Sequence, residues 1–293
     1  MADELNKTED IVWHYTTIDT TLKILNGKNM RATYYTGLND RLDIKYGFTI
    51  ALQILKKMNL QDAMFKELEG MFQDILNAQD PQLWYLICFS HDGDSISQWQ
   101  GYTDLQCGGC AIGFNKIELE TLFTDTGDKP EVRSFFPLCS IECLYDSQEI
   151  QFRLNSIILQ IKNELDKLQQ FKTCEGMSEF LHPKSGVFAA GMRVEIAKIA
   201  LGAKHKGFAH EKEYRLVFSS DDRHEIQLSE SCTKRFITCQ FNTNVLNVIK
   251  YIRLSPHGDI EYNRLKIENV LALHPEYKVE ILESDMPYRG RTI

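Results

Sequence analysis

Hydrophobic residues recur along the chain in two patterns, one typical of strands and one typical of helices. Short runs rich in β-branched and aromatic residues predict strands. Apolar residues spaced three and four apart predict helices. The strands are expected at residues 11–17, 31–36, 84–90, 110–114, 135–145, 214–219, 235–240, 248–254 and 278–282. The helices are expected at residues 19–25, 44–77 (two helices, or one broken near Asn59), 154–168, 187–201 and 261–271.

The order of these elements indicates the fold class. Strands gather towards both ends of the chain around a helical middle, which favours an α+β fold over a repeating βαβ arrangement. No internal repeat, low-complexity segment or obvious linker interrupts the sequence. We therefore expect residues 1–293 to form a single domain, with a mixed or antiparallel sheet as its core and a helical insertion at about residues 150–203.

Composition narrows the class of protein. With 43% hydrophobic and 25% charged residues among 293, the chain has the make-up of an ordinary globular protein. A net charge of -8 excludes bulk binding to a phosphate backbone and directs attention to a pocket. The acidic start of the chain lacks the apolar core of a secretory signal, and no apolar stretch is long enough to span a bilayer. We expect a cytoplasmic protein with no membrane partner.

The eight cysteines raise the question of a metal site. The spacing of Cys107, Cys110, Cys139 and Cys143 would suit a structural zinc ion. However, Cys110 opens an apolar run typical of a buried strand, and Cys139 and Cys143 lie in another. Because cysteine is a common small core residue, packing is the favoured interpretation and no metal is expected. The sequence also lacks the phosphate-binding glycine loops, H-E-x-x-H and G-x-S-x-G motifs.

Four clusters combine polar and aromatic residues in a way that packing alone does not require. Each has a structural explanation by itself: a core histidine, a turn, a capped helical turn or a charged strand face. On a strand, for example, Glu211, Glu213 and Arg215 would share one face. The clusters are Trp13-His14-Tyr15-Thr16, Leu38-Asn39-Asp40, Cys88-Phe89-Ser90 followed by Asp94 to Tyr102, and Lys206 to Leu216.

In this order, the clusters resemble a widespread bacterial family called domain of unknown function 2971. The resemblance runs from about residue 11 to 290, and its specificity lies in the order and spacing of short motifs. Two departures are present: Arg41-Leu42-Asp43 follows Asn39-Asp40 where the family usually has proline and an acidic residue, and Tyr214 replaces a tryptophan. The motifs are His14-Tyr15-Thr16, Asn39-Asp40, Cys88-Phe89-Ser90, Asp94-Ser95-Ile96-Ser97-Gln98-Trp99 with Tyr102, Gly109 to Phe114, Glu211 to Arg215, Ile252 to Pro256 and Met286 to Arg289.

The opening of the chain is more distantly similar to that of ADP-ribosyltransferase-like folds. This second resemblance implies that fold, NAD as substrate and no metal. Glu213 would stabilise the positive charge that develops on the ribose, and Glu211 would orient or deprotonate an acceptor. Tyr15, Trp99 or Tyr102 would stack on the nicotinamide, His14 would bind a ribose hydroxyl or the carboxamide, and Arg215 would hold Glu213 or a pyrophosphate. The expected catalytic residues are Glu213, Glu211 and His14, and the expected binding residues are His14, Tyr15, Thr16, Asn39, Asp40, Ser97, Trp99, Tyr102 and Arg215.

Three functions are compatible with these residues. The first is an NAD-dependent ADP-ribosyltransferase or NAD-cleaving effector, toxin-like or active in phage defence, with a protein or nucleic acid as acceptor. The second is a sensor that binds a nucleotide or another small ligand without catalysis. The third is an interaction module in which the motifs are purely structural. The order given is the order of preference.

Overall fold

The structure is a computed structural model that describes residues 10–38, 43–58, 63–77, 83–123, 135, 137–170, 187–220, 226–230 and 234–287. These residues form two compact units. The first comprises the described residues within Met1–Tyr34, Trp84–Ser140 and His210–Ile293. The second comprises those within Tyr35–Leu83 and Ile141–Ala209. That residues 1–293 form a single domain stays a prediction.

The core of the first unit is a sheet, to which ten strands of the described residues belong. The strands follow the order β10-β9-β4-β1-β3-β2-β8-β7, and β6 pairs with β3 and β5. The pairings of β1 with β3 and β4, of β2 with β3 and β8, of β4 with β9 and of β7 with β8 are antiparallel, whereas β10 pairs with β9 in parallel. This confirms the predicted α+β class with a mixed, mostly antiparallel sheet. The strands are β1 (Ile11–Thr17), β2 (Asn29–Tyr34), β3 (Leu83–Ser90), β4 (Gly109–Asn115), β5 (Pro137–Glu142), β6 (Glu213–Ser220), β7 (Gln227–Leu228), β8 (Arg235–Gln240), β9 (Ile249–Leu254) and β10 (Glu280–Glu283).

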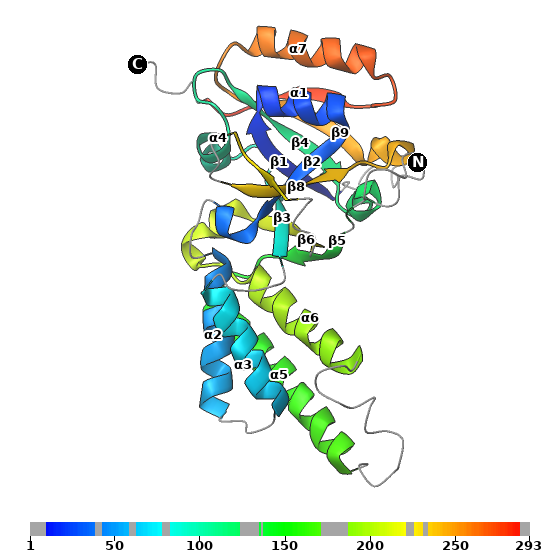
Figure 1. Cartoon of the computed structure of the whole chain (residues 1–293). Helices are drawn as coiled ribbons and strands as arrows, with labels where there is room; N and C mark the ends of the chain where they lie inside the picture. Colours follow the sequence, from blue (N-terminus) through cyan, green and yellow to red (C-terminus); the bar gives the residue numbers. More distant parts are fainter. Residues whose placement is uncertain are drawn as a thin grey trace, which may run out of the picture. The chain divides into compact units, whose positions relative to one another are not determined.

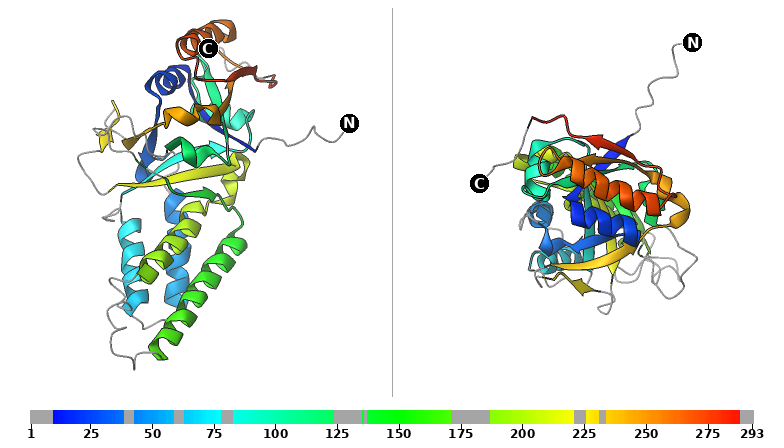
Figure 2. Two further views of the ribbon diagram at one scale, coloured as in Figure 1. Left: turned by 90° about the vertical axis from the view of Figure 1, so that its right-hand side faces the viewer. Right: turned by 90° about the horizontal axis from the view of Figure 1, so that it is seen from above.

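Helices flank this sheet. Helix α1 (Ile18–Gly27) packs against β4, and α7 (Ile260–Leu273) packs against both α1 and β9, so that the two helices lie side by side (Figure 2). Helix α4 (Ile96–Tyr102) packs against β1. Helix α1 follows β1 without a loop, so the last residue of the strand, Thr17, also caps the helix. The Thr17 hydroxyl oxygen accepts the N–H of Thr20. The first unit also contains the 3-10 helices η2 (Leu119–Phe123) and η5 (Thr243–Val248), and the last two residues of η3 (Lys206–Glu211) belong to it.

The pairing of β1 sorts its motif residues onto two faces. Tyr15 lies opposite Ala111, and Thr16 lies opposite Cys110. Since successive side chains of a strand point to opposite faces, Trp13 and Tyr15 share one face with Ala111, while His14 and Thr16 share the other with Cys110. Trp13, Tyr15, Ala111 and the Trp99 ring form one buried cluster, which places α4 on the first of these faces.

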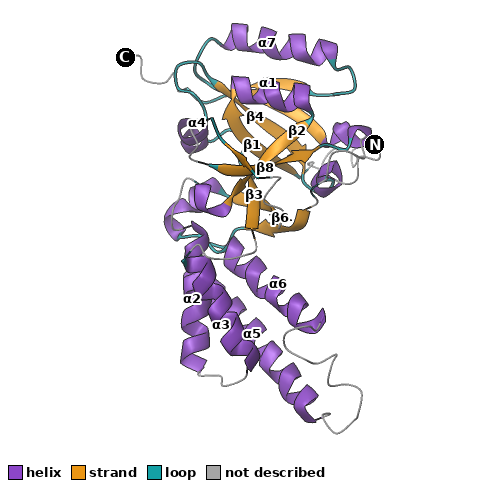
Figure 3. Ribbon diagram, in the orientation of Figure 1, coloured by secondary structure: helices purple, strands orange, loops and turns teal. Residues whose placement is uncertain are grey.

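The second unit is mainly helical (Figure 3). Helix α2 (Asp43–Met58) packs against α3 (Ala63–Leu76), α5 (Ser147–Gln170) and α6 (Val187–Gly202) (Figure 1). A Cβ at Gly47 would lie 2.0 Å from the main-chain oxygen of Ala200, so glycine permits the close crossing of α2 and α6. Of the two alternatives predicted for residues 44–77, two separate helices are confirmed by α2 and α3. The short η1 (Tyr35–Gly37) belongs to this unit.

None of the helices in the described residues is both long and apolar enough to cross a lipid bilayer.

Candidate functional site

The loop between β3 and α4 is fixed by the hydroxyl of Tyr15. This hydroxyl donates to the main-chain oxygen of Asp92 at 2.7 Å and accepts the N–H of Ser95 at 3.0 Å. Burial raises the pKa of Tyr15 far above its usual range, so the phenol stays a donor at all ordinary pH values. Its ring packs edge-on against Trp99, with 4.6 Å between ring centres. Because Tyr15 and Trp99 are buried, neither presents a ring face to solvent in this structure.

Asp94 lies in the same loop and gathers donors from three parts of the first unit. Its carboxylate accepts the indole N–H of Trp99 at 2.8 Å, the hydroxyl of Ser284 at 2.5 Å and the N–H of Asp285 at 2.8 Å. The Arg253 guanidinium lies 3.9 Å away. A carboxylate with several N–H and O–H donors is held strongly, because charge-assisted hydrogen bonds are about twice as strong as neutral ones.

A second set of contacts joins the end of β3 to the start of β6. The Ser90 hydroxyl donates to the main-chain oxygen of Glu211 at 2.7 Å, and the N–H of His91 donates to the oxygen of Lys212 at 2.9 Å. The Lys212 ammonium lies 3.2 Å from the Asp92 carboxylate. The motifs around Ser90 and Glu211 are therefore neighbours in space, although they are far apart in the sequence.

The prediction that Glu211, Glu213 and Arg215 share one strand face is wrong for Glu211. Strand β6 begins only at Glu213, and Glu211 ends η3. Between them Lys212 adopts a left-handed backbone conformation with φ 45°. This conformation is uncommon for a residue with a Cβ, and it breaks the alternation on which the prediction depended.

Glu213 and Arg215 do share one face of β6. The guanidinium donates to both carboxylate oxygens of Glu213, from Nε at 3.0 Å and from Nη2 at 2.7 Å. Both side chains are buried, so each charge is compensated by the other rather than by water. The predicted contact between Arg215 and Glu213 is thus present as a bidentate ion pair.

His14 lies on the opposite face of the sheet. Its Nδ1 is 2.9 Å from the oxygen of Cys88, and since a carbonyl only accepts, Nδ1 carries the proton. Burial lowers the pKa of His14, while the bond to Cys88 opposes part of that shift. The His14 ring packs against Phe89, which also contacts Tyr214. Tyr214 alternates with Glu213 along β6, so His14 and Glu213 are on opposite faces.

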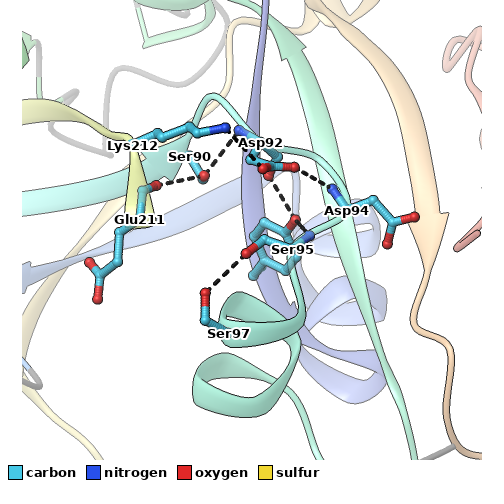
Figure 4. Close-up of polar contacts among 8 residues, drawn as sticks. Ser90, Asp92, Asp94, Ser95, Ser97, Glu211 and Lys212 are labelled. Carbon is cyan, nitrogen blue, oxygen red and sulfur yellow. Dashed lines mark hydrogen bonds and ion pairs between the residues drawn. The ribbon is translucent and has the colours of Figure 1, made fainter. Parts of the chain in front are cut away.

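The structure therefore brings some predicted residues together and separates others. Figure 4 shows the main chain of Glu211 bound by the Ser90 hydroxyl, with its carboxylate directed away from the other labelled contacts, and the Ser97 hydroxyl directed towards Ser95. The Ser95 and Ser97 hydroxyls are 3.0 Å apart. We call Ser90, Ser95, Ser97, Glu211 and Lys212 the polar edge. Tyr102, at the end of α4, is partly exposed. His14 and Thr16 are not at this edge, and Asn39 and Asp40 lie outside the described residues.

Several residues of this region were not predicted as site residues. Lys212 and Asp94 are inside recognised motifs, so the sequence alone could have indicated both as candidate site residues. Arg253 also lies inside a recognised motif, whereas Ser284 lies outside the motifs, and its link to Asp94 exists only after the chain has folded.

The cysteines contribute no metal cluster to the part of the chain that the structure describes. There, no group of three or more histidine, cysteine, aspartate or glutamate side chains is arranged to hold a metal ion. Cys107 is exposed, whereas Cys110 is buried in β4. Burial raises the pKa of the Cys110 thiol to about 12, which disfavours the thiolate that a metal would need.

Comparison with known proteins supports the family predicted from the motifs. Residues 98–216 match the family described as "Protein of unknown function (DUF2971)". The predicted resemblance to this family is confirmed over that segment, which runs from within α4 through β4 to the start of β6. No curated protein and no solved structure gives a significant match to the chain.

Proposed function

We propose that the first unit binds a nucleotide through its ribose at the polar edge, and that NAD is the ligand to test first. The observation that carries the proposal is that Glu211 and Lys212 are bound to Ser90 and Asp92, where the β3–α4 loop begins, and that the end of this loop carries the paired Ser95 and Ser97 hydroxyls (Figure 4). Strand pairing does not require this arrangement, because Glu211 precedes β6 and Ser97 lies in α4. Serine hydroxyls and a carboxylate along one such edge are groups that bind sugar hydroxyls.

The chemistry of these groups suits a ribose. An ionised carboxylate only accepts hydrogen bonds, and it accepts them well from two neighbouring hydroxyls. The hydroxyls of Ser95 and Ser97 both donate and accept, so they complement the remaining positions of the sugar. The Lys212 side chain is 58% exposed, which leaves its ammonium accessible to a phosphate group. The partly exposed Tyr102 offers an aromatic ring near the end of the same helix.

The contacts of Glu213 and His14 favour binding over catalysis. Both oxygens of Glu213 already accept hydrogen bonds from Arg215, and His14 is on the other face of the sheet. A ligand at the polar edge therefore meets Glu211 before it meets Glu213. This arrangement supports the sensor function more directly than the transferase function.

Cleavage of the bound NAD is the second candidate, and one observation favours it. Arg215 fixes the position of the Glu213 carboxylate, two residues after Glu211. In such a reaction the bond between ribose C1′ and the nicotinamide nitrogen breaks, and its electron pair leaves with neutral nicotinamide. Glu213 would stabilise the positive charge left on the ribose. Water or an acceptor hydroxyl would then bond to C1′ and give its proton to Glu211. The resemblance to ADP-ribosyltransferases, and a toxin-like or phage-defence role, belong to this candidate.

The test is calorimetric titration of the whole chain with NAD. We expect saturable binding to the wild type and binding about tenfold weaker or more in Glu211→Gln, because a hydrogen bond to a charged group contributes about 1.5–3 kcal/mol. The Ser90 hydroxyl binds the main-chain oxygen of Glu211, so this substitution leaves that contact in place. Glu120→Gln, an exposed glutamate of η2, is the matched control.

Nicotinamide release decides between the two candidates. Product formation by the wild type, lost in Glu213→Gln, would establish cleavage, whereas binding without product would establish a sensor. If NAD does not bind to the wild type, the proposed site is refuted for this ligand. Substitutions that lower stability alone would then favour the interaction module.

A further inference from the structure

The segment after β10 is tied to the loop before α4 through one side chain, Asp94. Its carboxylate receives the hydroxyl of Ser284 at 2.5 Å and the N–H of Asp285 at 2.8 Å. The Asp94 side chain is only 11% exposed. Hydrogen bonds to a largely buried carboxylate are strong, so these two bonds hold residues 284 and 285 firmly.

Ser284 is oriented for this contact from both sides. Its N–H donates to the oxygen of Leu254, at the end of β9, at 3.1 Å. Its hydroxyl oxygen accepts the N–H of Met286 at 3.1 Å and thus has its proton available for Asp94. The segment therefore continues the edge of the sheet for one residue and then turns onto Asp94.

A chain of direct contacts leads from Asp94 to the polar edge. Asp94 accepts the indole N–H of Trp99 at 2.8 Å, and the Trp99 ring packs against Tyr15. The Tyr15 hydroxyl accepts the N–H of Ser95 at 3.0 Å, and the Ser95 hydroxyl lies 3.0 Å from that of Ser97. Every step between Ser284 and Ser97 is a hydrogen bond or a ring contact in the first unit.

We propose that Asp94 is a positioning residue through which residues 284–286 set the order of the β3–α4 loop and the ligand affinity of the polar edge. If residues 284–286 move away from the loop, Asp94 loses two hydrogen bonds, from the Ser284 hydroxyl and the Asp285 N–H. The Asp94 side chain is then less ordered and binds the Trp99 indole less firmly. As a result, the positions of Ser95 and Ser97 become less ordered. The effect on ligand affinity rests on the proposed function, whereas the effect on loop order does not.

Three variants and a matched control separate this coupling from a general loss of stability. Ser284→Ala removes the hydroxyl that binds Asp94, and Ser284→Thr restores a hydroxyl. Asp94→Asn leaves one acceptor oxygen and puts an NH₂ group in the other position, so it cannot serve both Trp99 and Asp285. The matched control is Glu283→Gln, which alters the preceding residue but affects the ion pair with Arg264 of α7 instead.

Hydrogen exchange measured by mass spectrometry on residues 92–102 is the primary measurement. The amides of Ser95 and Trp99, which donate to the Tyr15 hydroxyl and the Ser95 oxygen, report the order of the loop. We expect about tenfold faster exchange in Ser284→Ala and Asp94→Asn, and wild-type exchange in Ser284→Thr and Glu283→Gln. The dissociation constant for NAD should rise by about threefold to tenfold in the first two variants only.

The outcomes are distinct. Unchanged exchange of residues 92–102 in Ser284→Ala overturns the coupling, as does an equal increase in Glu283→Gln. If Asp94→Asn does not fold, Ser284→Ala and its threonine rescue decide the question. If the wild type does not bind NAD, the proposed function fails, and faster exchange in Ser284→Ala still supports the coupling. If NAD binds and its dissociation constant is the same in all variants, the control of affinity is overturned.

Discussion

Gly93 lies between Asp92 and Asp94, and its lack of a side chain is what lets this loop pack on Trp13. A Cβ at this position would lie 2.3 Å from Cε2, 2.6 Å from Nε1 and 2.7 Å from Cδ2 of Trp13. Non-bonded carbon atoms settle at about 3.5–4.0 Å, so Gly93→Ala requires the loop or the indole ring to move by about an ångström.

The indole has little freedom to move. Trp13 is stacked on Tyr251, with 5.9 Å between ring centres, and the Arg253 guanidinium lies 5.0 Å from the Trp13 ring centre. Forcing an extra methyl group into such packing costs about 1–3 kcal/mol. For a protein of this size, each kcal/mol lowers the melting temperature by about 2–4 °C. We therefore expect Gly93→Ala to melt several degrees below the wild type.

Gly101 provides the matched control, because it lies in α4 and a Cβ there meets nothing within 4 Å. Gly101→Ala should leave stability unchanged or raise it by about 0.5–1 kcal/mol, since alanine favours the helix. Calorimetric melting of both variants checks the pair, with NAD titration as a second measurement. Equal melting temperatures for Gly93→Ala and the wild type would refute the packing of this loop on Trp13.

The other predictions concern charge, protonation and the second unit. Glu213→Ala should lower the free energy of unfolding by about 3–5 kcal/mol in urea titrations, because it removes the carboxylate that pairs with the buried Arg215 guanidinium. Since burial lowers the pKa of His14 from 6.5 in the folded state only, unfolding takes up a proton below pH 6.5. Stability should therefore fall as pH drops below 6.5, and less steeply in His14→Gln. Gly47→Ala should destabilise the α2–α6 crossing, whereas Gly70→Ala, with open space around it, should not; circular dichroism melts compare the two.

The sequence predicted those parts of the fold that depend on local pattern. Strand β1 has the predicted limits because its apolar run is bounded by the helix that Thr17 caps. The second strand begins and ends two residues before its predicted limits, because Tyr35 already belongs to η1. The pairing of β1 between β3 and β4 was not predictable, since register is set by contacts across the whole sheet.

The candidate site was predicted only in part, for a related physical reason. The motifs indicated Ser97, Trp99 and Glu211 as candidate site residues, but their spacing did not predict on which face of the sheet each of them lies. The left-handed backbone of Lys212 turns Glu211 away from the face of Glu213, and no residue type near it signals this. Ser284 and Asp94 are 190 residues apart in the sequence, so their contact depends entirely on tertiary structure.

The central claim is that the polar edge holds the ribose of a nucleotide, and a crystal structure of the wild-type chain with NAD tests it most directly. The account predicts ribose hydroxyls within hydrogen-bond distance of the Glu211 carboxylate and the Ser97 hydroxyl. NAD bound elsewhere on the first unit, with Glu211 and Ser97 making no contact to it, would contradict the account.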